Sequence, residues 1–308
     1  MTSVDVVKAN RLRHGKRASV FDYELAAAMV LLAIITLYPF INVLAVSFND
    51  AYDTIKGGIY LWPRMFTLAN YEQIFKDHNL IVAFRNSVLR TVIGMVVSVF
   101  CTTMMAYTLS RKDFIARRVF SLMFAVTMYV GGGMIPSYLL MRSLGLFGTF
   151  TVYILPSIVG AWNVFVIRSY IDGLPDSIQE SARVDGANDV VIFIRIVLPL
   201  CLPVLATVAL FVAVGQWNSW FDSYLYNNSK PNLTTLQYEL QKILTAATIS
   251  LTSASDQMAI SEMTRRTHVT PEALKMAMSI IVTAPVLVVY PFLQKYFVSG
   301  LTMGAVKS

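Results

Sequence analysis

Six long apolar runs constrain this 308-residue chain more than any other feature of its sequence. Each run holds about 20 residues, which is the length that an α-helix needs to cross the hydrocarbon core of a bilayer. Because backbone groups in lipid must form their hydrogen bonds internally, the runs predict an all-α integral membrane protein with six transmembrane helices. The predicted spans are Leu25–Val46, Val88–Leu109, Val119–Met141, Phe150–Ile167, Leu202–Phe221 and Leu274–Lys295.

The composition supports a membrane fold and opposes a soluble one. Hydrophobic residues make up 56% of the chain, charged residues only 14%, and the mean hydropathy is +0.59. A soluble core of this length could not bury so many apolar side chains. The net charge of +7 does not indicate nucleic-acid binding, because the basic residues cluster beside the apolar runs. Cys101 and Cys201 lie within such runs and are expected to be packing residues.

Basic residues between the runs set the expected orientation. Five cations precede the first span, and four more follow the second span between Arg111 and Arg118. The positive-inside rule places both segments in the cytoplasm, and six spans then bring the N- and C-termini to that side. Arg90, near one end of the second span, is expected to extend its side chain toward water. The loop Asp172–Ile196 is then inside, and the loops Ser47–Ser87 and Asp222–Ala273 are outside.

These assignments divide the chain into five segments. They are a basic N-terminal segment at 1–24, a first transmembrane helix at 25–46, an outer loop at 47–87, a transmembrane core at 88–297 and a tail at 298–308. The tail is rich in small residues and is predicted to be flexible. In the second outer loop, apolar residues from Leu236 to Ala247 recur at helical spacing. That helix is predicted either to pack on the spans or to receive a partner protein.

The loop between the fourth and fifth spans carries the most specific pattern in the chain. Pro175 ends the preceding segment, Asp176 is a candidate N-cap, and Gln179 follows three residues later as in a capping box. Gly186 supplies a left-handed stop, after which residues 188–189 begin another helix. The short helix also presents apolar groups to the cytoplasm, which predicts a protein partner. These apolar residues are Ile178, Ala182 and Val184.

This loop resembles the EAA motif of ABC importer permeases, in which E-A-A precedes three residues, a glycine, nine residues and I-x-L-P. Ser181 stands where the motif has an alanine, and the rest of the pattern matches. In that family the loop forms a coupling helix that docks into a cytoplasmic ATPase. The alternative is a purely structural connector. The resemblance implies ATPase docking by Glu180, Ser181, Ala182, Asp185 and Gly186, and packing against the fifth span by Ile196, Leu198 and Pro199.

Further stretches are similar to the LplC-type polysaccharide permeases of the carbohydrate-uptake branch. They are Gly131–Leu146, Trp217-Asn218 and the terminal Ser299–Lys307. The resemblance covers most of the chain from Asn86 onward and implies a type I ABC importer permease fold in the bacterial cytoplasmic membrane. It also implies oligosaccharides or polysaccharide fragments as cargo, and a tail that reaches toward the ATPase subunits.

ATP hydrolysis is expected on another polypeptide. The chain has no G-x-x-x-x-G-K-[ST] loop to hold phosphates, and its three histidines are dispersed among the loops. We therefore expect no catalytic residue, metal or cofactor on this chain, with ATP and Mg²⁺ bound by the partner ATPase. The resemblance implies a second homologous permease, two ATPase subunits and an extracytoplasmic solute-binding protein as partners, besides membrane lipid.

Polar and aromatic residues within the spans are candidates for the substrate path. Tyr129 and Gly132 lie in a span with three consecutive glycines, where both a break that lines the path and close helix packing remain open. Asn163 is predicted either to bond another helix or to contact a sugar hydroxyl. Trp217 and Asn218, near the outer end of the fifth span, fit an interfacial belt or a sugar-stacking platform.

Two other classes of membrane protein compete with the importer interpretation. A secondary sugar transporter would be expected to show an inverted repeat and intramembrane carboxylates, and neither is visible in the sequence. A membrane scaffold that recruits a cytoplasmic enzyme would explain the short docking helix. It would not explain why three glycines interrupt the third span.

Overall fold

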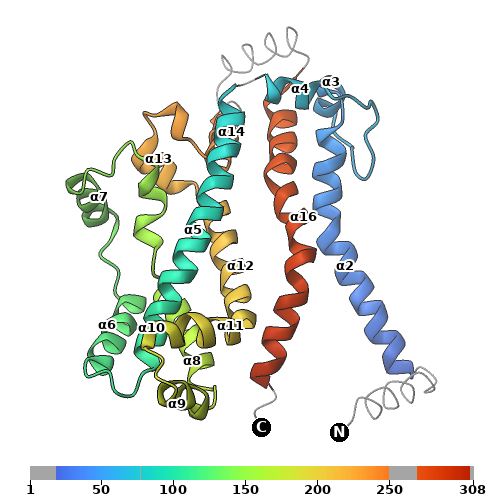
Figure 1. The fold of residues 1–308 in the computed structure, drawn as a ribbon. Coiled ribbons are helices and arrows are strands. Elements are labelled where there is room, and N and C mark those ends of the chain that lie inside the picture. The colour runs from blue at the N-terminus through green and yellow to red at the C-terminus, as the bar shows by residue number, and fades with distance from the viewer. Residues whose placement is uncertain (1–18, 77, 250–268, 306–308) are drawn as a thin grey trace.

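The computed structural model describes residues 19–76, 78–249 and 269–305. Within these ranges the chain is helical, with one isolated β-bridge between Asn49 and Phe66. Three helices are long and apolar enough to cross a membrane unaided, and the number of spans rises to six if three bent pairs each count as one. The three long helices are α2 (Val20–Ser47), α5 (His78–Ser110) and α16 (Pro271–Ala305), of which α2 and α16 lie side by side (Figure 1).

The other three predicted spans are interrupted. The pairs bend by 120°, 48° and 80°, respectively. The first is α6 (Arg117–Tyr129) with α7 (Met134–Ser143), and the second is η1 (Phe150–Tyr153) and η2 (Leu155–Ser157) with α8 (Ala161–Ile171). The third is α10 (Asp189–Ile192), the π-helical η3 (Phe193–Val197) and α11 (Leu198–Leu200) with α12 (Leu202–Asn218).

The third predicted span, Val119–Met141, is broken at its three glycines, which is one of the two interpretations that the sequence left open. Helix α6 ends at Tyr129, and Gly133 adopts a φ of +83° before α7 begins. Glycine reaches this left-handed conformation without the steric cost that a Cβ would bring, so the chain turns sharply here. No side chain of this chain lies within 4 Å of a Cβ built at Gly131 or Gly132. Within the described residues, the glycines therefore serve the break and not close helix packing.

The remaining elements are short helices that connect or cover the long ones. Helix α14 packs its apolar residues Leu236, Leu240 and Ile243 against Ala277 and Met278 of α16. This confirms that the helix predicted in the second outer loop packs on the spans. The short elements are α3 (Ala51–Ile55), α4 (Ala69–Phe75), α9 (Asp176–Val184), α13 (Phe221–Asn227), η4 (Pro231–Leu233) and α14 (Leu236–Ile249).

The last helix departs from the expectation of a flexible tail. Helix α16 continues through Gly300 to Ala305, so most of the predicted tail at 298–308 is helical. The beginning of α2, the short helix α9 and the end of α16 all lie at one end of the molecule (Figure 1). Most of the basic N-terminal segment, residues 1–18, lies outside the described residues.

A buried charge holds the centre of the fold together. Arg90 on α5 is only 2% exposed, so the prediction that it extends toward water is wrong. Its guanidinium forms an ion pair with Asp222 at 2.6 Å and donates to Gln216 Oε1 at 3.0 and 3.2 Å. It also donates to the Ser219 carbonyl at 3.2 Å and lies 4.5 Å from the centre of the Tyr153 ring. These contacts tie α5 to α12, α13 and η1.

Replacing Asp222 by alanine is expected to destabilise the protein by on the order of 3 kcal/mol. The substitution leaves a buried guanidinium without its counter-charge, and this is the costly way to break an ion pair. Lys112→Ala is the matched control, because it removes an ion pair whose side chains are 77% and 65% exposed and that contributes at most about 1 kcal/mol. Thermal unfolding of the purified protein in detergent measures both, and equal shifts would contradict the structural role of Arg90.

Candidate functional site

Helix α9 forms where the sequence predicts a short helix, but its first turn differs from the expectation. Pro175 occupies the N-cap position, so Asp176 is the first helical residue and the predicted capping box with Gln179 is wrong. The Asp176 carboxylate instead accepts from the Lys112 ammonium at 2.6 Å. Gln179 Oε1 accepts from the Arg111 guanidinium at 3.4 Å. The N-terminal turn of α9 is thus occupied by contacts with the segment between α5 and α6.

The C-terminal end of α9 has the predicted form. Gly186 adopts a φ of +82°. Its N–H donates to the Arg183 carbonyl at 3.0 Å, and the Ala187 N–H donates to the Ala182 carbonyl at 2.9 Å. These two bonds make a Schellman motif, which satisfies the last carbonyls of the helix. Asn188 then caps α10 by accepting from the backbone N–H of the third residue of that helix at 2.9 Å.

The exposed side of α9 carries most of the residues implied in docking. Glu180, Ser181 and Asp185 are exposed, and the Val184 side chain is 87% exposed beside them. Ala182 differs, because it is half-buried and packs against the apolar cluster shared by α5, α8 and α12. Val184, with Ile178 at 37% exposure on the same helix, gives α9 exposed apolar groups that a partner could contact.

The residues that hold the loop against the fifth span are not all those predicted. Leu198 packs against the same cluster and Ile196 is half-buried, but Pro199 is exposed. The fully buried contacts come from Ile192, Phe193 and Val197, which sequence reasoning missed. Their spacing follows the π-helical turn and not a regular α-helix, so the usual periodicity did not reveal them.

A network of charges, here called the clamp, joins α9 to the segment between α5 and α6. Arg111, whose side chain is only 12% exposed, lies 2.8 Å from Asp113 and 3.6 Å from Asp189. Arg183 on α9 lies 3.3 Å from Asp189 and 3.7 Å from Asp113. The Lys112–Asp176 pair completes the clamp at the other end of α9. Charges from three separate elements therefore fix the position of one short helix.

Hydrogen bonds within the clamp favour the charged forms of its members. The hydrogen bond from Arg111 lowers the pKa of Asp113, and a backbone hydrogen bond and the charge of Arg111 lower it further. The hydrogen bond to Asp176, followed by the charge of that carboxylate, raises the pKa of Lys112. The contribution of Asp113 is lost only as the pH falls through its lowered pKa, and that of Lys112 only as the pH rises through its raised one. The clamp therefore remains intact around neutral pH.

Arg111→Ala is expected to loosen α9. The substitution removes the least exposed cation of the clamp together with the bond to Gln179. Amide hydrogen exchange of Ser177–Val184 should become faster, because fewer contacts oppose local opening of the helix. Lys112→Ala, which removes a well-exposed pair, should have a smaller effect. Unchanged exchange in the Arg111 variant would show that the clamp does not hold α9.

Gly186→Val is expected to disrupt the end of α9 without clashing with any neighbour. A Cβ built at Gly186 has no atom within 4 Å, so the cost is backbone strain at positive φ, about 1–2 kcal/mol. Gly186→Asn is the matched control, because asparagine tolerates the left-handed conformation. The resemblance to ABC importer permeases predicts that uptake, and co-purification of an ATPase, are impaired in the valine variant and largely retained in the asparagine variant. Normal assembly and uptake with valine would contradict a role for this turn.

A cavity of about 490 Å³ adjoins the buried Arg90. Of the residues predicted to line a substrate path, only Asn163 reaches it. Asn163 reaches the cavity from α8 and is half-buried there, so its side-chain amide stays a candidate for contact with a sugar hydroxyl or with another helix. The polar side chains around the cavity are Arg90, Ser98, Tyr153, Ser157, Asn163, Gln216, Ser219, Asp222 and Tyr226.

The other path candidates lie elsewhere. Trp217 is 7% exposed, and its indole donates to the Val282 carbonyl at 3.1 Å, so it is neither a stacking platform nor part of an interfacial belt. Asn218 is exposed and does not line the cavity. Tyr129 is 87% exposed, and Gly132 lies in the exposed break after α6. Sequence reasoning missed Gln216 and Arg90, because their pairing joins residues 126 positions apart.

The arrangement of helices matches a solved structure of known role. A bacterial ABC transporter involved in the import of the acidic polysaccharide alginate contains a similar chain, with a TM-score of 0.80 and 29% sequence identity. The match covers 92% of this chain and 99% of that chain. Fold and sequence together define a carbohydrate permease of the ABC importer type, which is an inner-membrane protein and not an enzyme.

The chain belongs to the family of binding-protein-dependent transport system inner membrane components, which matches residues 80–303. It is 38% identical to the polygalacturonan/rhamnogalacturonan transport system permease protein YtcP of Bacillus subtilis, over 94% of this chain and 98% of YtcP. It is 35% identical to protein LplC of the same organism, over 98% of this chain and all of LplC. The resemblance to LplC-type permeases is therefore confirmed.

Proposed function

We propose that this chain is one of two homologous permeases in an ATP-driven importer of oligosaccharides or polysaccharide fragments, with α9 as its coupling helix. The observation that carries the proposal is the exposed face of α9. The face combines Glu180, Asp185 and the apolar Val184, and the clamp holds it in place from behind. A helix fixed on one side and exposed on the other is suited to transmit motion from a docked protein.

The proposed complex contains this chain, a second permease, two ATPase subunits and an external solute-binding protein. ATP and Mg²⁺ bind to the ATPase subunits. The loop with α9 and both chain termini face the cytoplasm, which the basic residues on either side of the first two spans support. Glu180 makes no ion pair with the described residues, so its carboxylate is available to a cation of the ATPase.

The proposed cargo is a carbohydrate, and its contact in this chain is the cavity beside Arg90. Amides, hydroxyls and two tyrosine rings line the cavity, which is the chemistry that sugar hydroxyls and ring faces require. The charge of Arg90 is balanced by Asp222. The substrates in the names of the two relatives, polygalacturonan/rhamnogalacturonan and alginate, are polysaccharides and support the same class of cargo.

Asn163→Ala tests this contact. Loss of one hydrogen bond to a bound sugar, worth about 1 kcal/mol, should raise the concentration for half-maximal uptake roughly fivefold. Asn218→Ala is the matched control, because it removes an exposed amide outside the cavity. Uptake by proteoliposomes that contain the assembled transporter distinguishes the two variants. Equal half-saturation in both would remove Asn163 from the substrate path.

The coupling proposal is tested with the same proteoliposomes. Oligosaccharide should accumulate only when ATP reaches the ATPase subunits and the binding protein is present on the opposite side. A secondary transporter would accumulate sugar from a proton or sodium gradient without ATP. A scaffold would accumulate none in either condition. Gradient-driven accumulation without ATP would overturn the proposed function.

A further inference from the structure

The loop between α3 and α4 folds back along α2. Gly57 and Gly58 turn the chain with φ values of +70° and +73°, respectively. The side-chain amide of Asn42 on α2 donates to the carbonyls of Ile59 and Tyr60 at 2.8 and 3.0 Å. In Figure 1 the loop after α3 descends beside the C-terminal part of α2. The tip of the loop therefore lies level with residues inside a membrane span and not beyond its end.

The depth of the contact follows from helix geometry. Asn42 precedes the last residue of α2, Ser47, by five positions, which is about 7.5 Å along the helix axis. At this level α2 exposes apolar side chains, among them Phe40 at 58% and Leu44 at 42%. Helix α2 exposes apolar groups over most of its surface, as a lipid-facing span does. Its C-terminal end therefore lies at the boundary between lipid headgroups and acyl chains.

The tip presents side chains that suit this boundary. Tyr60, Leu61 and Trp62 are 65%, 58% and 83% exposed, respectively, while Ile59 is buried against α2. No charged residue lies between Gly57 and Pro63. Tyrosine and tryptophan, with a large apolar body and one polar group, concentrate where a membrane meets water. A contiguous exposed group of this kind on a soluble surface would be unusual.

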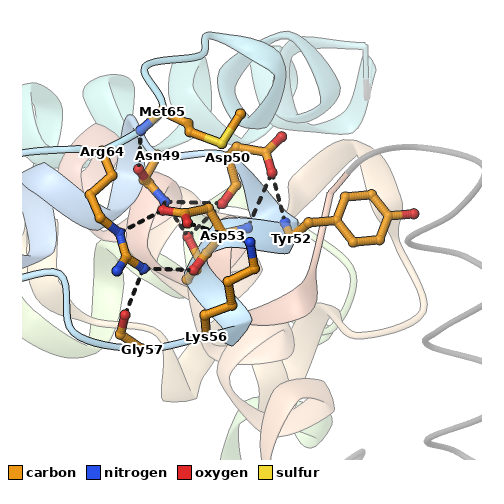
Figure 2. Close-up of polar contacts among 9 residues, drawn as sticks. Asn49, Asp50, Tyr52, Asp53, Lys56, Gly57, Arg64 and Met65 are labelled. Atoms are coloured by element: carbon orange, nitrogen blue, oxygen red, sulfur yellow. Dashed lines mark hydrogen bonds and ion pairs between the residues drawn. The ribbon is translucent and has the colours of Figure 1, made fainter.

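The charged side chains next to the tip form contacts at the base of the loop. Arg64 donates through Nε to Asp53 Oδ2 at 2.9 Å and through Nη2 to the Asp53 and Gly57 carbonyls at 3.1 and 2.7 Å. Asn49 donates to the same carboxylate at 3.1 Å and accepts from the Met65 N–H at 2.9 Å. Figure 2 shows the bonds from Arg64 and Asn49 meeting at Asp53, with further bonds to Gly57 and Met65 beside it. The base is polar and fixed, and the tip is apolar and exposed.

We propose that the Gly57–Phe66 loop is a membrane anchor whose tip, Tyr60–Trp62, inserts beside α2 into the interfacial region of the bilayer. Its partner is lipid. Insertion into the membrane removes the exposed aromatic side chains from water. The ion pair with Asp53 keeps Arg64, the only cation between Gly57 and Phe66, out of the apolar layer. With the proposed orientation, the bilayer leaflet concerned is the outer one, and the anchor itself does not depend on that orientation.

Spin labels at two positions of the same loop test the anchor. Labels are attached to Trp62→Cys and, as the matched control, Lys56→Cys, whose native side chain is 72% exposed at the polar base. Both variants carry Cys101→Ala and Cys201→Ala, and the assembled transporter is placed in lipid nanodiscs. Collision of each label with oxygen, which enters the bilayer, is compared with collision with a water-soluble nickel chelate. The label at position 62 should favour oxygen severalfold more than the label at position 56.

Three other outcomes would overturn the proposal. Equal preference at both positions would place the tip in water. Shielding of position 62 from both reagents would assign the tip to a protein interface with the second permease. Nickel access that disappears when the solute-binding protein is added would assign it to that protein. If the labelled variants do not assemble, quenching of tryptophan fluorescence by brominated lipid provides the second measurement. The wild-type protein should lose more fluorescence than Trp62→Phe, and equal losses would overturn the anchor.

Discussion

The guanidinium of Arg90 is buried in the interior of the bundle, where Asp222, Gln216 and the Ser219 carbonyl surround it. An unpaired guanidinium in this environment would be too costly to bury, so the fold brings the Asp222 carboxylate and the Gln216 amide to it from elements far along the chain. The positions of α12 and α13 relative to α5 follow from this requirement. The cavity beside Arg90 follows as well, because the Gln216 amide also donates to Ser157 at 2.8 Å and so draws η2 to the same place.

The breaks in the spans place the proposed coupling loop. An 80° bend separates α10–α11 from α12, so the segment from α10 to α11 runs at a steep angle to the helix that follows it. Proline at position 203, in the first turn of α12, lacks the N–H that a continuous helix would use. The π-helical turn just before the bend rotates Phe193 and Val197 into the core, and the apolar cluster there anchors the loop. The loop that carries helix α9 is thereby anchored to the apolar cluster on one side, and the opposite side of the helix is exposed.

The sequence predicts this protein well where the signal is local, and less well where distant residues decide. Apolar runs give the number of spans, and the spacing from Glu180 to Pro199 identifies the loop. The left-handed Gly186 also follows from local steric rules, and its φ of +82° confirms it. The burial of Arg90 and of Trp217 was not predictable in this way. Each depends on an acceptor far along the chain, Asp222 for Arg90 and the Val282 carbonyl for Trp217, that only the packed structure brings near.

The clamp attaches α9 to the bundle at two points, with Lys112–Asp176 near one end of the helix and Arg111–Asp189–Arg183 near the other. A helix held at one point can pivot when it is pushed, whereas a helix held at both ends passes the applied force to the elements that hold it. In the proposed coupling, a displacement of α9 would therefore reach the segment that follows α5 and, through Asp189, helix α10 at the same time. The electrostatic part of this attachment weakens as ions screen its exposed pairs. The stiffness of the mechanical link thus depends on the ionic strength of the solution that bathes α9.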